Sequence, residues 1–127
     1  MKAYGETLAR MFENAAKGMF SIMLDMTQDA EATKSTDLVL EQEEENIEQM
    51  FVDWLNELLY LVDTENLVPS TITVTQVDGK CLRAAVSGNP FNKEIHRYKT
   101  EIKSTTYHML EIGRENDKYF GMILFDI

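Results

Sequence analysis

Two β-strands are predicted at the C-terminal end of the chain: residues 102–109, Ile-Lys-Ser-Thr-Thr-Tyr-His-Met, and residues 119–127, Tyr-Phe-Gly-Met-Ile-Leu-Phe-Asp-Ile. Residues 113–118 between them, Gly-Arg-Glu-Asn-Asp-Lys, are rich in turn formers. Because strand-like stretches joined by a short turn fold back on each other, we expect an antiparallel hairpin that runs to the last residue.

The register of this hairpin would bring the C-terminus close to a lysine. With Ile112 opposite Tyr119, counting outward places Asp126 and Ile127 within one or two residues of Lys103. The Asp126 side chain and the α-carboxyl group of Ile127 would then be two carboxylates near one ammonium group. Carboxylates select hard divalent cations such as Ca²⁺, Mn²⁺ or Mg²⁺. Two of them form an incomplete shell, which a third protein ligand or water must complete.

Two amphipathic helices are predicted upstream. Apolar residues spaced three and four apart indicate a helix of about five turns that begins near Glu6 or Thr7. Asn46 is the expected N-cap of a second helix that ends near Asp63. The first apolar stripe comprises Leu8, Met11, Phe12, Ala15, Ala16, Met19, Ile22, Met23 and Met26. The second comprises Ile47, Met50, Phe51, Trp54, Leu55, Leu58, Leu59 and Val62.

Three further strands are predicted, at residues 37–41, 71–77 and 80–86, the last two joined by a turn at Asp78-Gly79. Residues 27–35 and 91–101 are expected to be connectors. The fold class is therefore α+β in two layers, with two amphipathic helices packed on an antiparallel or mixed β-sheet. We expect one domain over residues 1–127, because the chain has no linker, repeat or low-complexity segment.

Composition limits the function and the location. The acids number 22 and the bases 12, which gives a net charge of −10. A protein that grips RNA by itself normally needs a basic patch, so direct high-affinity nucleic-acid binding is disfavoured. An acidic surface suits a basic protein partner. The chain has no membrane-length apolar stretch and does not start like a signal peptide, and a lone cysteine, Cys81, fits the reducing cytoplasm.

Three stretches together resemble the archease family: residues 3–16, residues 54–65, and residues 103–109 with the terminal residues 125–127. Archeases are small proteins that activate the GTP-dependent RNA-splicing ligase of tRNA maturation. The resemblance implies an accessory protein without turnover of its own, which helps the ligase become guanylylated and turn over repeatedly. It also implies Lys103 as the residue needed for activation and Asp126 and Ile127 as ligands of a divalent metal, while GTP acts through the ligase.

One family feature is absent from the sequence. Archeases carry a third metal ligand, the aspartate of a His-Thr-Ala-Asp motif, on the first strand shortly before the Tyr-Gly that matches Tyr4-Gly5. We therefore expect that Met1 is an internal methionine and that a short segment with this motif precedes it.

Two other kinds of function stay open. A small metal-dependent hydrolase or transferase would use Lys103 and Tyr107 directly, and a chaperone-like module would bind proteins through its methionine-rich first helix. The sequence has no glycine-rich phosphate loop, nucleophile elbow, Cys-x-x-Cys or His-Glu-x-x-His motif. His108 is expected on the core face of its strand, as an interior histidine with satisfied hydrogen bonds.

Overall fold

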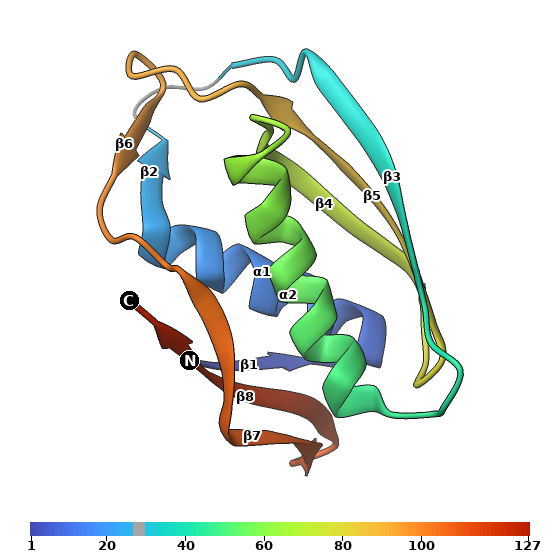
Figure 1. Cartoon of the computed structure of the whole chain (residues 1–127). Helices are drawn as coiled ribbons and strands as arrows, with labels where there is room; N and C mark the ends of the chain where they lie inside the picture. The colour runs from blue at the N-terminus through green and yellow to red at the C-terminus, as the bar shows by residue number, and fades with distance from the viewer. Residues whose placement is uncertain (27–29) are drawn as a thin grey trace.

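The computed structural model describes residues 1–26 and 30–127 (Figure 1). It contains two helices and eight strands in this part of the chain, and every strand pair is antiparallel. The elements are β1 (Lys2–Gly5), α1 (Leu8–Met23), β2 (Leu24–Met26), β3 (Lys34–Glu41), α2 (Ile47–Asp63), β4 (Val68–Val77), β5 (Cys81–Asn89), β6 (His96–Tyr98), β7 (Ser104–Glu115) and β8 (Lys118–Asp126). The predicted α+β class is confirmed.

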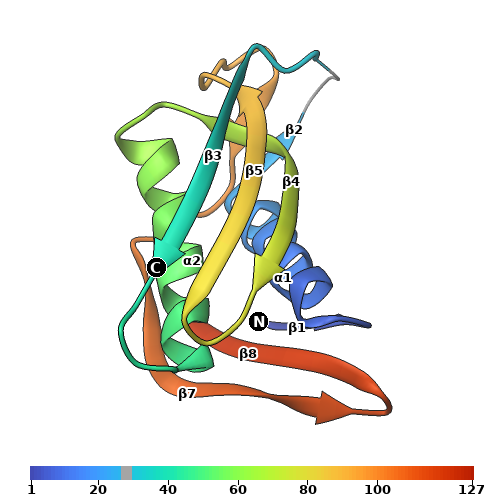
Figure 2. The same cartoon turned by 90° about the vertical axis from the view of Figure 1, so that its right-hand side faces the viewer.

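The strands form three small sheets around the two helices. Their orders are β1-β8-β7, β2-β6 and β3-β5-β4. Figures 1 and 2 show the sheet β3-β5-β4 along one side of both helices, and the sheet β1-β8-β7 below them. The core therefore lies between the helices and the inner faces of these two sheets. Neither helix in the described residues is long and apolar enough to cross a membrane.

The helix α1 begins where the sequence predicts but ends earlier. The Thr7 side chain caps it by accepting a hydrogen bond from the Arg10 backbone N–H (3.1 Å). The apolar pattern continues past Met23, but the next three residues leave the helix and pair with β6 as β2. Ile22, expected in the buried stripe, is 36% exposed.

The helix α2 follows its prediction closely. The Asn46 side chain caps it by accepting from the Gln49 backbone N–H (3.0 Å), and the helix ends at Asp63. Apart from half-buried Ile47, every residue of the predicted apolar stripe is buried, and Val52 and Leu61 are buried as well. α2 therefore packs a wide apolar face into the core and keeps a narrower face at the surface, where Tyr60 is 50% exposed.

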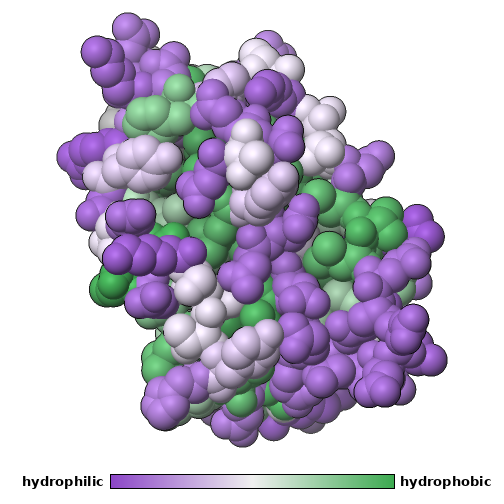
Figure 3. Space-filling model, viewed as in Figure 1, coloured by the Kyte–Doolittle hydropathy of each residue, from purple (hydrophilic) through white to green (hydrophobic). Residues whose placement is uncertain are grey.

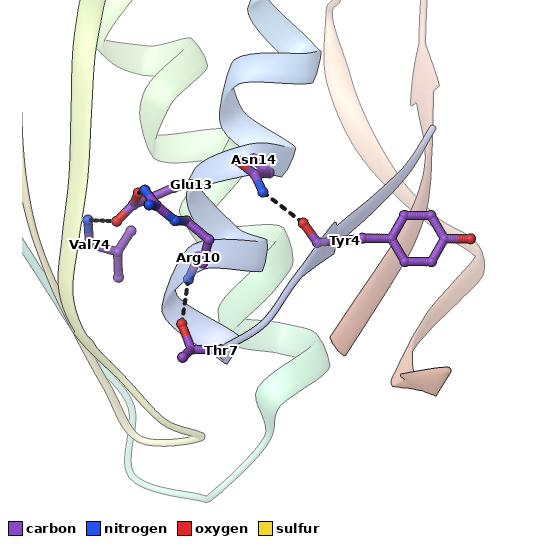
Figure 4. A network of polar contacts seen from close by, with 6 residues as sticks. All are labelled: Tyr4, Thr7, Arg10, Glu13, Asn14 and Val74. Carbon is purple, nitrogen blue, oxygen red and sulfur yellow. Dashed lines mark hydrogen bonds and ion pairs between the residues drawn. The ribbon is translucent and has the colours of Figure 1, made fainter. Parts of the chain in front are cut away.

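A buried glutamate joins α1 to the sheet β3-β5-β4 (Figure 4). Glu13 is 7% exposed, and its carboxylate accepts hydrogen bonds from the Val74 backbone N–H (2.9 Å) and from Arg10 Nη1 (3.1 Å). On the other side of the helix, Asn14 Nδ2 donates to the Tyr4 carbonyl oxygen (2.7 Å). The first turns of α1 are thus held between β1 and β4, and the amphipathic pattern alone gives no sign of it.

The remaining strands are longer than predicted. β3 starts at Lys34, β4 at Val68, and β5 continues to Asn89. The turn between β4 and β5 is confirmed: the Asp78 carboxylate accepts from the backbone N–H groups of Lys80 (2.8 Å) and Cys81 (2.9 Å). These two bonds lower the pKa of Asp78.

The connector at residues 91–101 contains one buried residue, His96, which is 2% exposed. Its Nδ1 accepts a hydrogen bond from the Asn92 backbone N–H (2.9 Å), so this contact requires a neutral ring. The imidazole also stacks on Phe91, with ring centroids 5.6 Å apart. Burial lowers the pKa of His96.

We expect His96 to make stability fall as the pH drops below about 6.5, the ordinary pKa of histidine. In the unfolded chain the ring takes up a proton there, while the folded protein still holds it neutral, so protons favour unfolding. Urea unfolding at pH 7.5 and 5.5 should show a larger loss of stability for the wild type than for His96→Gln. An equal loss for both proteins would contradict this role.

Candidate site at the C-terminal tip

The hairpin of β7 and β8 is present, but its turn is placed differently from the prediction. Arg114, not Ile112, lies opposite Tyr119. The turn residues Asn116 and Asp117 have φ angles of 53° and 64°. Positive φ at both central residues is typical of a type I′ turn, whose backbone twist matches that of the two strands of a hairpin.

A bulge in β7 changes the register further along. Thr106 lies opposite Leu124 and Glu111 opposite Met122, so the four residues 107–110 face a single residue of β8. Met109 within the bulge has a φ of 58°. The bulge breaks the alternation of side chains, and His108 is exposed. Its predicted place in the core is therefore wrong.

Lys103 and Asp126 are neighbours in the backbone. The Lys103 N–H donates to the Asp126 carbonyl oxygen (2.8 Å), and Ser104 lies opposite Asp126. The side chains of Lys103 and Asp126 are exposed, and Ile127 is 70% exposed. Within the described residues, no ion pair within 4.0 Å joins the lysine to the aspartate. The tip thus presents an ammonium group and two carboxylates to solvent without tying them to each other.

An asparagine of α2 holds the start of β7 in place. Asn56 Oδ1 accepts hydrogen bonds from the backbone N–H (3.2 Å) and the hydroxyl group (3.0 Å) of Thr105, which is 7% exposed. Thr105 is two residues from Lys103, so Asn56 fixes the backbone that carries the lysine. The sequence analysis did not identify Asn56 as a site residue. The one feature that could have indicated it is an amide side chain beside the apolar stripe, two residues after Trp54.

The strand β8 lies between β1 and β7 and close to both helices. A Cβ atom on Gly121 would lie 2.8 Å from Met11 Sδ and 2.9 Å from Phe51 Cζ, so only glycine allows this approach. The Met1 ammonium group donates to the Ile123 carbonyl oxygen (2.8 Å). The start of the chain therefore runs beside β8 as far as Ile123.

The described residues supply only part of a metal site. They contain no group of three or more His, Cys, Asp or Glu side chains that could hold an ion. Asp126 and Ile127 can offer at most two carboxylates. Such a pair suits a cation that keeps most of its water, as Mg²⁺ does, but it does not make a complete protein cage.

Comparisons with known proteins agree on one family. The model of the Archease protein family (MTH1598/TM1083) matches residues 1–127. The chain is 34% identical to Protein archease of Methanosarcina acetivorans, over 98% of this chain and 86% of that protein. It is also 34% identical to Protein archease of Pyrococcus furiosus, over 100% of this chain and 90% of that protein.

Two solved structures share the fold. The solution structure of Methanobacterium thermoautotrophicum protein 1598 matches with a TM-score of 0.80 and 33% identity, over 99% of this chain and 89% of that one. The crystal structure of a Thermotoga maritima archease, described as a possible chaperone, matches with a TM-score of 0.68 and 21% identity, over 100% of this chain and 88% of that one. The chain belongs to the archease family.

Proposed function

We propose that this archease is a cytoplasmic accessory protein that activates a GTP-dependent tRNA-splicing RNA ligase, with a divalent metal bound at its tip. Family membership supports this role. The observation that carries the assignment to the tip is the hydrogen bond between the Lys103 N–H and the Asp126 carbonyl oxygen. That bond keeps the lysine beside the chain's terminal carboxylates.

The exposed lysine is suited to act on a partner's nucleotide. An ammonium group on a flexible four-carbon stem is a point charge that binds phosphate oxygens. GTP would be held by the ligase, and Lys103 would orient its phosphates from outside. The net charge of −10 favours encounter with a basic enzyme and disfavours a separate grip on RNA.

A titration of the purified protein into a guanylylation and ligation assay tests this function. Sub-stoichiometric amounts should stimulate many ligase turnovers, because an activator is not consumed. Conversion of substrate without any ligase would instead indicate a hydrolase or transferase. Protection of unrelated unfolded proteins, with no effect on the ligase, would indicate a chaperone-like module.

Blocking the C-terminal carboxyl group should weaken metal binding. Amidation of Ile127 removes a charge without changing a side chain. The attraction between unit charges 4 Å apart is about 1 kcal/mol in water and ~4 kcal/mol at an effective dielectric constant of 20, so loss of a direct ligand should cost about tenfold or more in affinity. Calorimetry with Mn²⁺ should show this fall.

The matched control for this prediction is Asp117→Asn, which removes one exposed carboxylate at the far end of the same hairpin. Its affinity for Mn²⁺ should stay close to that of the wild type. The measurement should be repeated in a chain extended before Met1 by the family's His-Thr-Ala-Asp segment. β1 pairs with β8 in the antiparallel direction, so residues added before Met1 would continue along β8 toward Asp126. Equal affinities for free and amidated Ile127 in the extended chain would rule out the terminal carboxylate as a ligand.

A further inference from the structure

The bulge in β7 presents two apolar side chains to solvent. Tyr107 is 61% exposed and Met109 is 58% exposed, and exposed His108 lies between them. Figure 3 shows the molecule in the view of Figure 1, with hydrophobic patches separated by hydrophilic surface. Tyrosine and methionine are also enriched in the contact surfaces of proteins.

Hydrogen bonds to α2 hold the bulge. Gln49 Nε2 lies 3.0 Å from the Tyr107 hydroxyl oxygen, and it also donates to Asp53 Oδ1 (2.8 Å). The tyrosine ring is therefore fixed before any partner arrives, which lowers the entropy cost of binding. We call Tyr107, His108, Met109, Gln49 and Asp53 the bulge surface.

The bulge is retained at a cost to the fold. Met109 has a positive φ, which is unfavourable for a residue with a long side chain. The buried Thr106 hydroxyl at the start of the bulge has no hydrogen-bond partner among the described residues. A regular ladder would avoid the backbone cost. Local strain of this kind often accompanies a functional site.

An acidic hollow lies next to the bulge surface. Its volume is about 370 Å³, and it is lined by Leu40, Glu41, Met50, Asp53, Asn56, Glu57 and Tyr60. Three of these residues are carboxylates and none is a base. Asp53 belongs both to the hollow and to the bulge surface, and Asn56 links the hollow to Thr105, two residues from Lys103. Hydrogen bonds thus connect the hollow to the bulge and to the start of β7.

We propose that the bulge surface is the contact that holds a basic protein partner, separate from the tip that acts on it. Tyr107 and Met109 fill an apolar recess of the partner, and an arginine or lysine of the partner enters the hollow. The partner's charge follows from the hollow's three carboxylates, none of which forms an ion pair within the described residues, and from the net charge of −10. Naming this partner as the RNA ligase rests on the proposed function.

Binding and stimulation should separate in variants. Tyr107→Ala combined with Met109→Ala should raise the Kd for the ligase at least tenfold, while stimulation at saturating concentrations stays at the wild-type level. Lys103→Ala should do the opposite, with an unchanged Kd and no stimulation. Asp53→Asn should raise the Kd and reduce its dependence on salt. Val39→Ala, which trims a 48% exposed residue on another sheet, is the control and should change neither quantity.

Met109→Gly distinguishes binding from folding. Glycine accepts a positive φ without strain, so the melting temperature should not fall, whereas the Kd should rise because the side chain is lost. Tyr107→Phe keeps the ring but loses the contact with Gln49, and it should bind more tightly than Tyr107→Ala.

The outcomes distinguish this proposal from the proposed function. A wild type that stimulates the ligase, with bulge variants that bind equally well, would overturn the bulge contact and leave the proposed function standing. A wild type that neither binds nor stimulates the ligase would overturn both. If the bulge variants lose affinity for the ligase only to the extent that their melting temperature falls, the bulge has a structural role alone. That result would overturn the proposed contact.

Discussion

Lys103→Ala should give a folded protein that no longer stimulates the ligase. Lys103 is exposed and precedes β7, so its loss should change the free energy of unfolding by no more than about 0.5 kcal/mol. Stimulation should disappear because the variant loses the ammonium group of the residue whose backbone is hydrogen-bonded to Asp126. Asp126→Ala should have the same effect, since it removes the neighbouring charge of the tip.

Initial rates of guanylylation at saturating archease measure this loss, and urea unfolding checks that the variants are folded. Lys118→Ala is the matched control, because it removes an exposed lysine at the opposite end of β8. Full stimulation by either Lys103→Ala or Asp126→Ala would contradict the role assigned to the tip.

Trp54→Ala should remove roughly 3–5 kcal/mol from the free energy of unfolding. Trp54 is fully buried, and its indole Nε1 donates to the Phe12 carbonyl oxygen (3.0 Å), which joins α2 to α1. Truncation opens a cavity and leaves that carbonyl without its partner. Domains of this size are stable by about 5–15 kcal/mol, so the loss is a large fraction of the total.

Far-UV circular dichroism during urea unfolding is the suitable measurement, because Trp54 is the only tryptophan and its removal abolishes the usual fluorescence signal. Tyr60→Ala on the same helix is the control; this side chain is 50% exposed, and its loss should cost much less. A Trp54→Ala variant as stable as the control would mean that the two helices do not depend on this contact.

The helices could be predicted because their determinants are local. The cap at Asn46 and the apolar spacing of α2 lie within one stretch of chain, and both hold in the structure. The end of α1 could not be predicted in the same way. Met26 continues the apolar pattern, but Leu24–Met26 pair with β6, 70 to 74 residues away. Such distant pairing overrides local preference and leaves no mark in a short window.

The predicted pairing of the strand at Lys103 with the strand end at Asp126 is confirmed, although the predicted register is wrong. The predicted register places Ile112 two residues away from its observed partner, Gly121. The bulge shifts the register in the opposite direction and compensates for this difference. As a result Asp126 pairs with Ser104, next to Lys103. The bulge itself depends on the backbone of Met109, a residue that rarely adopts a positive φ, and the strand-like sequence gave no hint of it.

The place of β8 in its sheet has a consequence for how the protein is made. β8 follows both β1 and β7 in the chain, yet it is the middle strand between them. β1 must therefore wait for β8 before it can pair, since the hydrogen bond from Met1 to Ile123 spans 122 positions of the sequence. Pairing over such separations is slow, and the open edges of β1 and β7 stay exposed to other chains until it is complete. The sheet that carries the tip can form only after β8 has been synthesised.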